Sequence, residues 1–295
     1  MKIFGIFGDP IEHSLSPVMQ NAAFRSMGLD ACYHAFRVSK ENLFDAVIGA
    51  GAMGFGGLNL TIPLKEKALS MPEICLDGLA RDIGAINTIS FERDEPKEKE
   101  AFSEKIRVHG HNTDAKGALM ALKQAGARIR GSSVLIIGAG GAARAIAYAL
   151  GKDGADLSIA NRSPERAVSL AKSIGAATGA SVRGFGLERL RDLVPASDIV
   201  INSTSVGMRE GDGRVLDAGL ITSDQIIFDI VYNRRTELLR NAAAAGAIAI
   251  DGVMMLVFQG ARAIEIWTGR EAPVDVMEQA VRDALEARAR GHGKA

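Results

Sequence analysis

The chain has 295 residues with 35 basic and 35 acidic side chains, so its formal net charge is zero. That balance gives no support for a nucleic-acid or membrane-surface partner, because both require a basic excess. The two cysteines form no CxxC pair, which fits a reduced, cytoplasmic setting, and no apolar run is long enough to span a bilayer. The length predicts two domains rather than one core.

The first 125 residues predict short strands and helices in alternation. The strands are expected at 2–7, 32–38, 84–91 and 106–109, with a further strand that Pro63 closes, and the helices at 17–27, 41–50 and 115–125. The apolar stretch of the first strand is too short for a signal peptide. The run of mixed charge at 93–105 predicts a solvated loop, to which we assign no function.

Two serines stand close together in the motif HSLSP at 13–17. Ser16, ahead of Pro17, has the position of a helix N-cap. Ser14 has no such role, so one serine of the pair remains for a ligand.

Polar residues also gather in the stretch GLNLTIPLK at 57–65. Asn59 and Thr61 are two apart at a strand end, so they face the same side. Lys65 opens the next helix. A lone lysine there is usually a solvated surface residue, but these neighbours beside turn residues favour a ligand site.

The segment that follows carries further candidates. Asn87 stands at the start of the strand in GAINTISF. His109 and His111 lack a third partner of metal-ligand type, so we predict no metal site. Asp114 precedes a helix, and the sequence leaves open whether it is an N-cap carboxylate, a catalytic one, or both.

The stretch SVLIIGAGGAARAIA at 133–147 predicts a buried strand, a glycine turn and a helix. Gly138, Gly140 and Ala143 match the pattern GxGxxG/A, in which small residues allow a tight turn and bring the backbone close to a pyrophosphate. The unpaired N–H groups of the helix N-terminus favour such an anion. The motif therefore predicts a dinucleotide site.

Strands and helices alternate from here on, which predicts a doubly wound parallel sheet with helices on both faces. The expected strands are 134–137, 157–160, 181–185, 198–202, 226–230 and 247–250. Two mononucleotide-binding halves require six strands, so the sheet is complete by about residue 251. Residues 252–295 predict two helices. Two helices are too few to form a domain, so they should pack back on the first domain.

The second strand of this sheet indicates which dinucleotide is bound. In NAD-binding sheets an acid near its end accepts hydrogen bonds from the ribose 2′-OH. Here the strand ends in Asn161-Arg162-Ser163, and Asp156 lies before it. An arginine with Asn and Ser suits a 2′-phosphate, and Arg166 adds a second cation one turn on. The alternative is a solvated turn in which Ser163 caps the next helix. That alternative explains Ser163 but not the absence of an acid at the strand end, so we predict NADP.

Taken together, these motifs resemble the shikimate dehydrogenase family over nearly the whole chain. The matching stretches are HSLSP at 13–17, NLTIPLK at 59–65, GAINT at 84–88, NTDAKG at 112–117, GAGGAAR at 138–144, NRS at 161–163, NSTSVGM at 202–208, DIVY at 229–232 and DGVMMLVFQGA at 251–261. The resemblance implies reduction of 3-dehydroshikimate to shikimate with NADPH, on the route to chorismate and the aromatic amino acids. It implies an α/β fold in which an N-terminal substrate domain, 1–114 with 252–295, and a Rossmann-type NADP domain, 115–251, flank the cleft that holds the site.

The resemblance also implies the site residues. Ser14 and Ser16 would hold the substrate carboxylate, with Tyr232 near it, and Lys65 and Asp114 would be the proton-transfer pair. The ring hydroxyls would be bound by Asn59, Thr61, Asn87 and Gln259. The cofactor would be bound by Gly138, Ala139, Gly140, Gly141, Ala142, Asn161, Arg162, Ser163, Arg166 and Gly252, with Thr204, Ser205, Gly207 and Met208 at the nicotinamide end.

Three positions depart from the family pattern: Ser163 stands where Thr is usual, Arg234 replaces a proline, and Gln20 stands where His is common. A quinate/shikimate dehydrogenase, often NAD-using, is the alternative enzyme, and Arg162 argues against it. A dinucleotide-sensing regulator without chemistry would be expected to lose Lys65 and Asp114, and both are present. The sequence does not set the oligomeric state, and a homodimer stays open.

Overall fold

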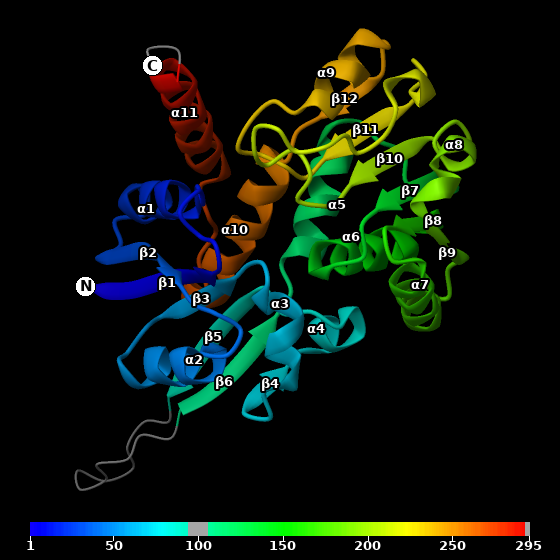
Figure 1. The fold of residues 1–295 in the computed structure, drawn as a ribbon. Coiled ribbons are helices and arrows are strands. Elements are labelled where there is room, and N and C mark those ends of the chain that lie inside the picture. The colour runs from blue at the N-terminus through cyan, green and yellow to red at the C-terminus, as the bar shows by residue number, and fades with distance from the viewer. Residues whose placement is uncertain (94–105, 293–295) are drawn as a thin grey trace, which may run out of the picture. The chain divides into compact units, whose positions relative to one another are not determined.

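The computed structural model describes residues 1–93 and 106–292. It divides into two compact units: unit 1 comprises residues 1–113 with 260–284, and unit 2 comprises residues 114–259 with the chain from 285 on. Each unit has its own six-stranded sheet (Figure 1). The loop predicted at 93–105 lies outside the described residues, apart from its first residue.

The sheet of unit 1 is mixed. Its strands are β1 (Lys2–Gly8), β2 (Ala31–Arg37), β3 (Gly57–Leu60), β4 (Ile74–Leu76), β5 (Thr88–Arg93) and β6 (Ile106–His111), in the order β2-β1-β3-β5-β6-β4. β1 is parallel to β2 and β3, whereas β5 is antiparallel to both β3 and β6. Its helices are α1 (Ser16–Ser26), α2 (Leu43–Ala52), α3 (Leu64–Lys67) and α4 (Gly78–Ile83), with a short 3-10 turn at Ala68–Ser70.

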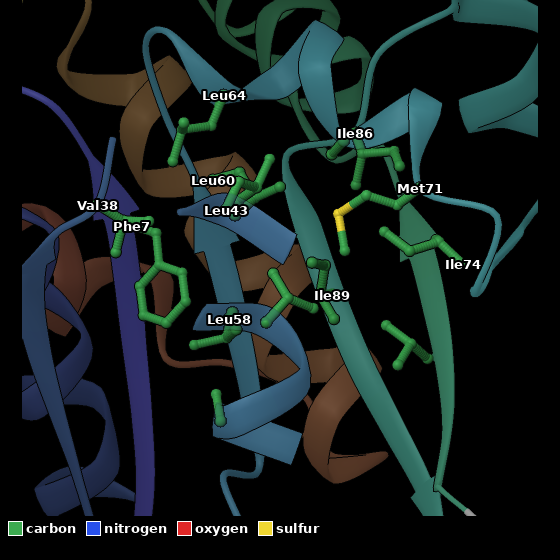
Figure 2. Close-up of a cluster of buried hydrophobic side chains, with 14 of the residues drawn as sticks. Phe7, Val38, Leu43, Leu58, Leu60, Leu64, Met71, Ile74, Ile86 and Ile89 are labelled. Atoms are coloured by element: carbon green, nitrogen blue, oxygen red, sulfur yellow. The ribbon is translucent and has the colours of Figure 1, made fainter. Parts of the chain in front are cut away.

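Alternation along β3 gives the two faces of this sheet different roles. Leu58 and Leu60 are buried in an apolar cluster with side chains of α2 and α3, which Figure 2 shows close up. Asn59 points to the opposite face, as the period of two in a strand requires. There Phe4 of β1 packs against Phe24 of α1, with ring centroids 5.0 Å apart. One face of the sheet thus packs on the apolar cluster with α2 and α3, and the other combines aromatic packing against α1 with buried polar side chains such as Asn59.

Two elements were not predicted, and one strand begins later than predicted. Asp77 caps α4 by accepting the Ala80 N–H at 2.6 Å, and Gly84, at φ 73°, ends that helix. The strand predicted from residue 84 therefore begins only at Thr88, because the helix end and its turn occupy the preceding residues. β4 and α4 have three and six residues, too few to show a hydrophobic period.

The sheet of unit 2 is parallel throughout and confirms the predicted doubly wound fold. Its strands are β7 (Ser133–Ile137), β8 (Asp156–Asn161), β9 (Val182–Gly186), β10 (Ile199–Asn202), β11 (Ile226–Asp229) and β12 (Ile248–Ile250), in the order β12-β11-β10-β7-β8-β9. The order reverses between β7 and β10, and ligands of such sheets bind at the carboxyl ends of the strands there. Its helices are α5 (Asp114–Gln124), α6 (Gly141–Lys152), α7 (Pro164–Thr178), α8 (Leu190–Leu193) and α9 (Glu237–Ala244), with 3-10 turns at Leu187–Arg189 and Ala218–Leu220.

Two helices follow β12, as predicted: α10 (Val253–Thr268) and α11 (Val274–His292). The units change within α10, at 259/260, whereas the sequence predicts the domain boundary after 251. In unit 1, Gln20 of α1 donates from Nε2 to the Gly260 carbonyl at 3.2 Å, and Trp267 donates from Nε1 to the Ile89 carbonyl at 2.9 Å. No helix in the described chain is long and apolar enough to cross a membrane.

Candidate functional site

The serine pair lies at the start of α1, but Ser16 is not its N-cap. The helix begins at Ser16 itself, Leu15 holds the N-cap position, and no side chain caps there. The Ser16 N–H donates instead to Ser14 Oγ at 3.2 Å. The predicted cap is therefore wrong, because Ser14 satisfies this N–H and Pro17 has none to offer. The Ser16 hydroxyl, in a residue only 3% exposed, is left without the capping role.

Asn59 and Asn87 come together through direct hydrogen bonds. Asn59 Nδ2 donates to the Asn87 carbonyl at 3.2 Å and to Thr88 Oγ1 at 3.0 Å. Tyr33 donates its hydroxyl to Asn59 Oδ1 at 2.7 Å. Both asparagines are almost fully buried at the strand ends of unit 1.

Asn87 is held from its other side by Thr113. Its Oδ1 accepts the Thr113 N–H at 2.7 Å, and its Nδ2 donates to Thr113 Oγ1 at 2.9 Å. Sequence reasoning assigned no site role to Tyr33, Thr88 or Thr113. Thr88 and Thr113 stand inside the motifs GAINT and NTDAKG, and membership of these motifs is the signal that could have identified them.

Thr61 and Lys65 belong to the same region of unit 1. The Thr61 N–H donates to the Phe7 carbonyl at 2.9 Å, which extends the β1–β3 pairing past the end of β3. Lys65 is half-buried in α3, and its carbonyl accepts the Ile86 N–H at 2.9 Å. The main chain of α3 is therefore fixed directly beside Asn87.

Asp114 and Gln259 lie in unit 2, on helices that pack closely. Asp114 is the first residue of α5 and is 3% exposed, so the helix starts one residue earlier than predicted. A Cβ added to Gly117 would approach the Met255 carbonyl oxygen to 2.9 Å and the Gln259 nitrogen to 3.0 Å. Only glycine allows α5 and α10 to approach this closely.

The glycine turn has the conformation that its motif predicts. Gly138 has φ +118°, and an added Cβ would lie 2.6 Å from Ser203 Oγ. Gly140 holds the N-cap position of α6 and offers no side chain to its first N–H groups. Ala143 is fully buried where the helix meets the sheet. This turn fits a dinucleotide pyrophosphate, because no side chain caps the first N–H groups of α6 and these groups can donate to an anion.

The residues predicted to select NADP lie beside this turn. Asn161 ends β8 and Arg162 is exposed, while Asp156 opens the strand at its far end. Arg166 donates from Nη2 to the Ala139 carbonyl at 3.2 Å, which joins α7 to the glycine turn. Ser163 is the N-cap residue of α7, but its hydroxyl makes no capping bond.

The loop at 203–208 is held by a buried carboxylate. Asp229 accepts hydrogen bonds from Thr236 Oγ1 at 2.6 Å and Asn202 Nδ2 at 2.9 Å, and Asn202 Oδ1 accepts the Thr204 hydroxyl at 2.7 Å. Burial raises the pKa of Asp229, and these donors oppose the rise. The network therefore positions Thr204, whereas Ser205 and Met208 are exposed.

Tyr232 and Gly252 follow the last two strands of this sheet. Tyr232 is half-buried, and its neighbour Asn233 donates from Nδ2 to the Met208 carbonyl at 3.0 Å. A Cβ on Gly252 would come within 2.5 Å of the Ile230 carbonyl carbon, so close packing explains this glycine.

His111 has structural partners. Its Nδ1 lies 2.8 Å from Asp77 Oδ2 and its Nε2 lies 2.9 Å from Ser90 Oγ. Burial acts to raise the pKa of Asp77, but hydrogen bonds with His111 and the Ala80 N–H outweigh it, so the pKa is lowered. Over residues 1–93 and 106–292, no group of three or more His, Cys, Asp or Glu residues is placed to hold a metal ion.

The predicted site residues thus form two sets, each within its own unit. Unit 1 holds Ser14, Ser16, Asn59, Thr61, Lys65 and Asn87, while Asp114, Tyr232, Gln259 and the predicted cofactor residues belong to unit 2.

Three family models match the chain along most of its length. The shikimate dehydrogenase substrate binding domain matches residues 6–89, shikimate/quinate 5-dehydrogenase matches 120–243, and the shikimate 5′-dehydrogenase C-terminal domain matches 252–282. The NADP⁺ shikimate dehydrogenase of Methanothrix thermoacetophila is 58% identical over 97% of this chain and 98% of its own length. That of Methanosarcina acetivorans is 50% identical over 97% and 99%.

Solved structures agree over the same extent. A shikimate dehydrogenase in complex with NADP⁺ matches with a TM-score of 0.84 and 38% identity, over 97% of this chain and 96% of that one. The Thermus thermophilus enzyme in complex with NADP(H) and shikimate gives 0.81 and 36%, over 96% and 100%. A quinate dehydrogenase from Corynebacterium glutamicum in complex with NAD gives 0.83 and 29%, over 96% and 99%. With the predicted motifs and three matching domain models in chain order, the chain belongs to the shikimate dehydrogenase family.

Proposed function

We propose that this chain catalyses the reversible, NADPH-dependent reduction of 3-dehydroshikimate to shikimate in aromatic amino acid biosynthesis. The observation that carries the proposal is the 58% identity, over 97% of the chain, to a relative named NADP⁺ shikimate dehydrogenase. Structures of family members with bound shikimate and NADP(H) support the same pair of ligands.

Unit 2 would hold the cofactor. The glycine turn and the first N–H groups of α6 would bind its diphosphate, and Asn161, Arg162 and Arg166 its 2′-phosphate. The loop from Thr204 to Met208, with Gly252, would lie at the nicotinamide end. NADPH, when bound, supplies the hydride that reduces the ketone.

Most of the groups proposed to bind the substrate belong to unit 1. The hydroxyls of Ser14 and Ser16 would donate to the carboxylate, with Tyr232 of unit 2 near it. Ring hydroxyls would meet a set of polar side chains, namely Asn59, Thr61, Asn87 and Gln259.

Lys65 and Asp114 would transfer the proton that the reaction requires. As the ketone is reduced, negative charge develops on its oxygen, and an ammonium both stabilises that charge and supplies the proton. In the oxidative direction the same amine accepts the hydroxyl proton. Asp114 would orient Lys65 and share its proton, so the two side chains would titrate as a coupled pair.

An absorbance assay at the reduced-nicotinamide band tests this function. Shikimate and quinate are each offered with NADP⁺ and with NAD⁺. We expect the combination of shikimate and NADP⁺ to be turned over fastest. Faster turnover of quinate with NAD⁺ would favour the alternative enzyme, and no turnover of any of the four pairs would refute the proposed function.

Two finer parts of the proposal concern the assembly and the compartment. We infer a cytoplasmic enzyme from its biosynthetic role and cysteine usage. A homodimer is consistent with the sequence, and sedimentation of the purified chain would decide between one and two copies.

A further inference from the structure

The amide of Asn59 is held in one orientation by its neighbours. The Asn87 carbonyl lies 3.2 Å from Asn59 Nδ2, and a carbonyl can only accept. An amide rotated by half a turn would place Oδ1 against that carbonyl, oxygen facing oxygen. Nδ2 must therefore face Asn87, and Oδ1 must face Tyr33.

This orientation fixes the direction of the bond to Tyr33. Because Oδ1 carries no hydrogen, the Tyr33 hydroxyl is the donor across the 2.7 Å contact. The two hydrogens of Nδ2 serve Asn87 and Thr88. Within the described chain, these bonds leave Asn59 one unused hydrogen-bonding position, the second lone pair of Oδ1.

Tyr33 is itself held rigidly. It is fully buried, and its ring centroid lies 6.2 Å from that of Trp267. Its N–H donates to Asn21 Oδ1 and its carbonyl accepts from Asn21 Nδ2, both at 2.9 Å. Asn21 belongs to α1, so β2 and α1 together fix the place of the Tyr33 hydroxyl.

We propose that Tyr33 is a positioning residue that makes Asn59 an acceptor-only contact, so that this point of the site selects a ring hydroxyl and rejects a carbonyl. The proposal rests on the proposed function and deepens it. The ketone that is reduced can only accept, so it cannot pair with Asn59. Asn59 therefore binds a ring hydroxyl that the reaction leaves unchanged, which keeps the ketone toward Lys65.

The first test needs only the unmodified enzyme. Shikimate analogues carry fluorine or hydrogen in place of one non-reacting hydroxyl, and their affinities are measured by competition with shikimate. Fluorine cannot donate and would face the Oδ1 lone pair, so at one position the fluoro analogue should bind more weakly than the deoxy analogue. If, at each non-reacting hydroxyl position, the fluoro analogue binds as well as the deoxy analogue, the acceptor-only assignment is overturned.

The second test is Tyr33→Phe, which removes the hydroxyl and keeps the ring. We expect the KM for shikimate to rise roughly five- to twentyfold, with kcat changed by less than about threefold. The affinity for NADP⁺ should stay unchanged. Tyr148→Phe in α6 is the matched control and should leave the shikimate KM unchanged.

The analogues separate positioning from a general structural effect. Tyr33→Phe should barely weaken the deoxy analogue that lacks the Asn59-bound hydroxyl, because the affected contact is already gone. Equal weakening of shikimate and of both deoxy analogues would make Tyr33 merely structural. If the unmodified enzyme does not turn over shikimate, the proposed function fails, whereas normal turnover with an unchanged Tyr33→Phe KM refutes only this inference.

Discussion

At the scale of single residues, Lys65 and Asp114 are expected to carry the chemistry. Lys65→Ala should lower kcat by about 10²–10⁴, because the proton donor and the charge facing the developing oxyanion are lost together. Substrate affinity should fall much less. Asp114→Asn should also lower kcat, and the double variant should be little worse than Lys65→Ala, since the two act together.

Measurements of kcat and shikimate affinity for these three variants check this. Lys67→Ala, in the same helix, is a matched control that should leave kcat unchanged. A near-normal kcat for Lys65→Ala would remove this lysine from the mechanism.

Arg162 is expected to set the choice of cofactor. It is exposed at the end of β8, where an NAD-binding sheet carries an acid. Losing a charge-assisted contact to phosphate costs roughly 1.5–3 kcal/mol, so NADP⁺ should be preferred over NAD⁺ by about ten- to a hundredfold. Arg162→Asp should lower the ratio of kcat/KM with NADP⁺ to kcat/KM with NAD⁺, or bring it below one. Equal use of both cofactors by the unmodified enzyme would contradict the assignment.

The two serines should differ in what their loss does. Both Ser14→Ala and Ser16→Ala should raise the KM for shikimate and leave NADP⁺ binding intact. Only Ser14→Ala also removes the acceptor of the Ser16 N–H, so it should lower the free energy of unfolding by about 1 kcal/mol. Kinetics and urea unfolding of both variants test this. Equal loss of substrate and cofactor binding would mean that the serines are only structural.

At the scale of elements, two carboxylates at strand ends should respond to pH in opposite ways. Burial raises the folded-state pKa of Asp229. Its stabilising contribution is therefore full below about pH 3.9, the unfolded value, and is lost as pH rises through the folded value. Hydrogen bonds lower the pKa of Asp77 despite burial, so its contribution is present above that value and lost as pH falls.

Urea unfolding between about pH 4 and pH 6.5 measures the Asp229 effect, and unfolding between about pH 2.5 and pH 5 measures the Asp77 effect. The stability of the unmodified protein relative to Asp229→Asn should decrease as pH rises. Relative to Asp77→Asn it should increase. The same sign of slope for both variants would show that local burial and hydrogen bonding do not govern these groups.

Much of the element pattern could be predicted because it repeats within short windows. The strands and the glycine turn of unit 2 follow from apolar runs and small residues that are neighbours in sequence. The site is harder, because its contacts join distant residues: Tyr33 and Asn59 come from different strands, and Thr113 reaches Asn87 from the end of another. No local pattern distinguishes Tyr33 from any buried aromatic side chain, so only the structure identifies its hydroxyl as a donor to Asn59.

At the scale of the whole molecule, unit 1 is completed by residues far along the chain. Residues 260–284 belong to it, and α10 begins in unit 2. Because α10 is continuous through this boundary, unfolding of either unit is expected to fray the part of α10 that belongs to the other unit. Ligand binding to either unit is therefore expected to stabilise both.

The protein has a single tryptophan, Trp267, and it lies in the unit 1 half of α10. Its ring packs 5.0 Å from that of Phe4, so its emission should shift to longer wavelength when unit 1 unfolds. Tryptophan fluorescence therefore reports on unit 1 alone, because unit 2 contains no tryptophan. Adding NADP⁺, a ligand proposed for unit 2, should raise the midpoint of the tryptophan transition along with that seen by circular dichroism. A fluorescence midpoint that stays in place while the dichroism midpoint rises would show two units that melt separately.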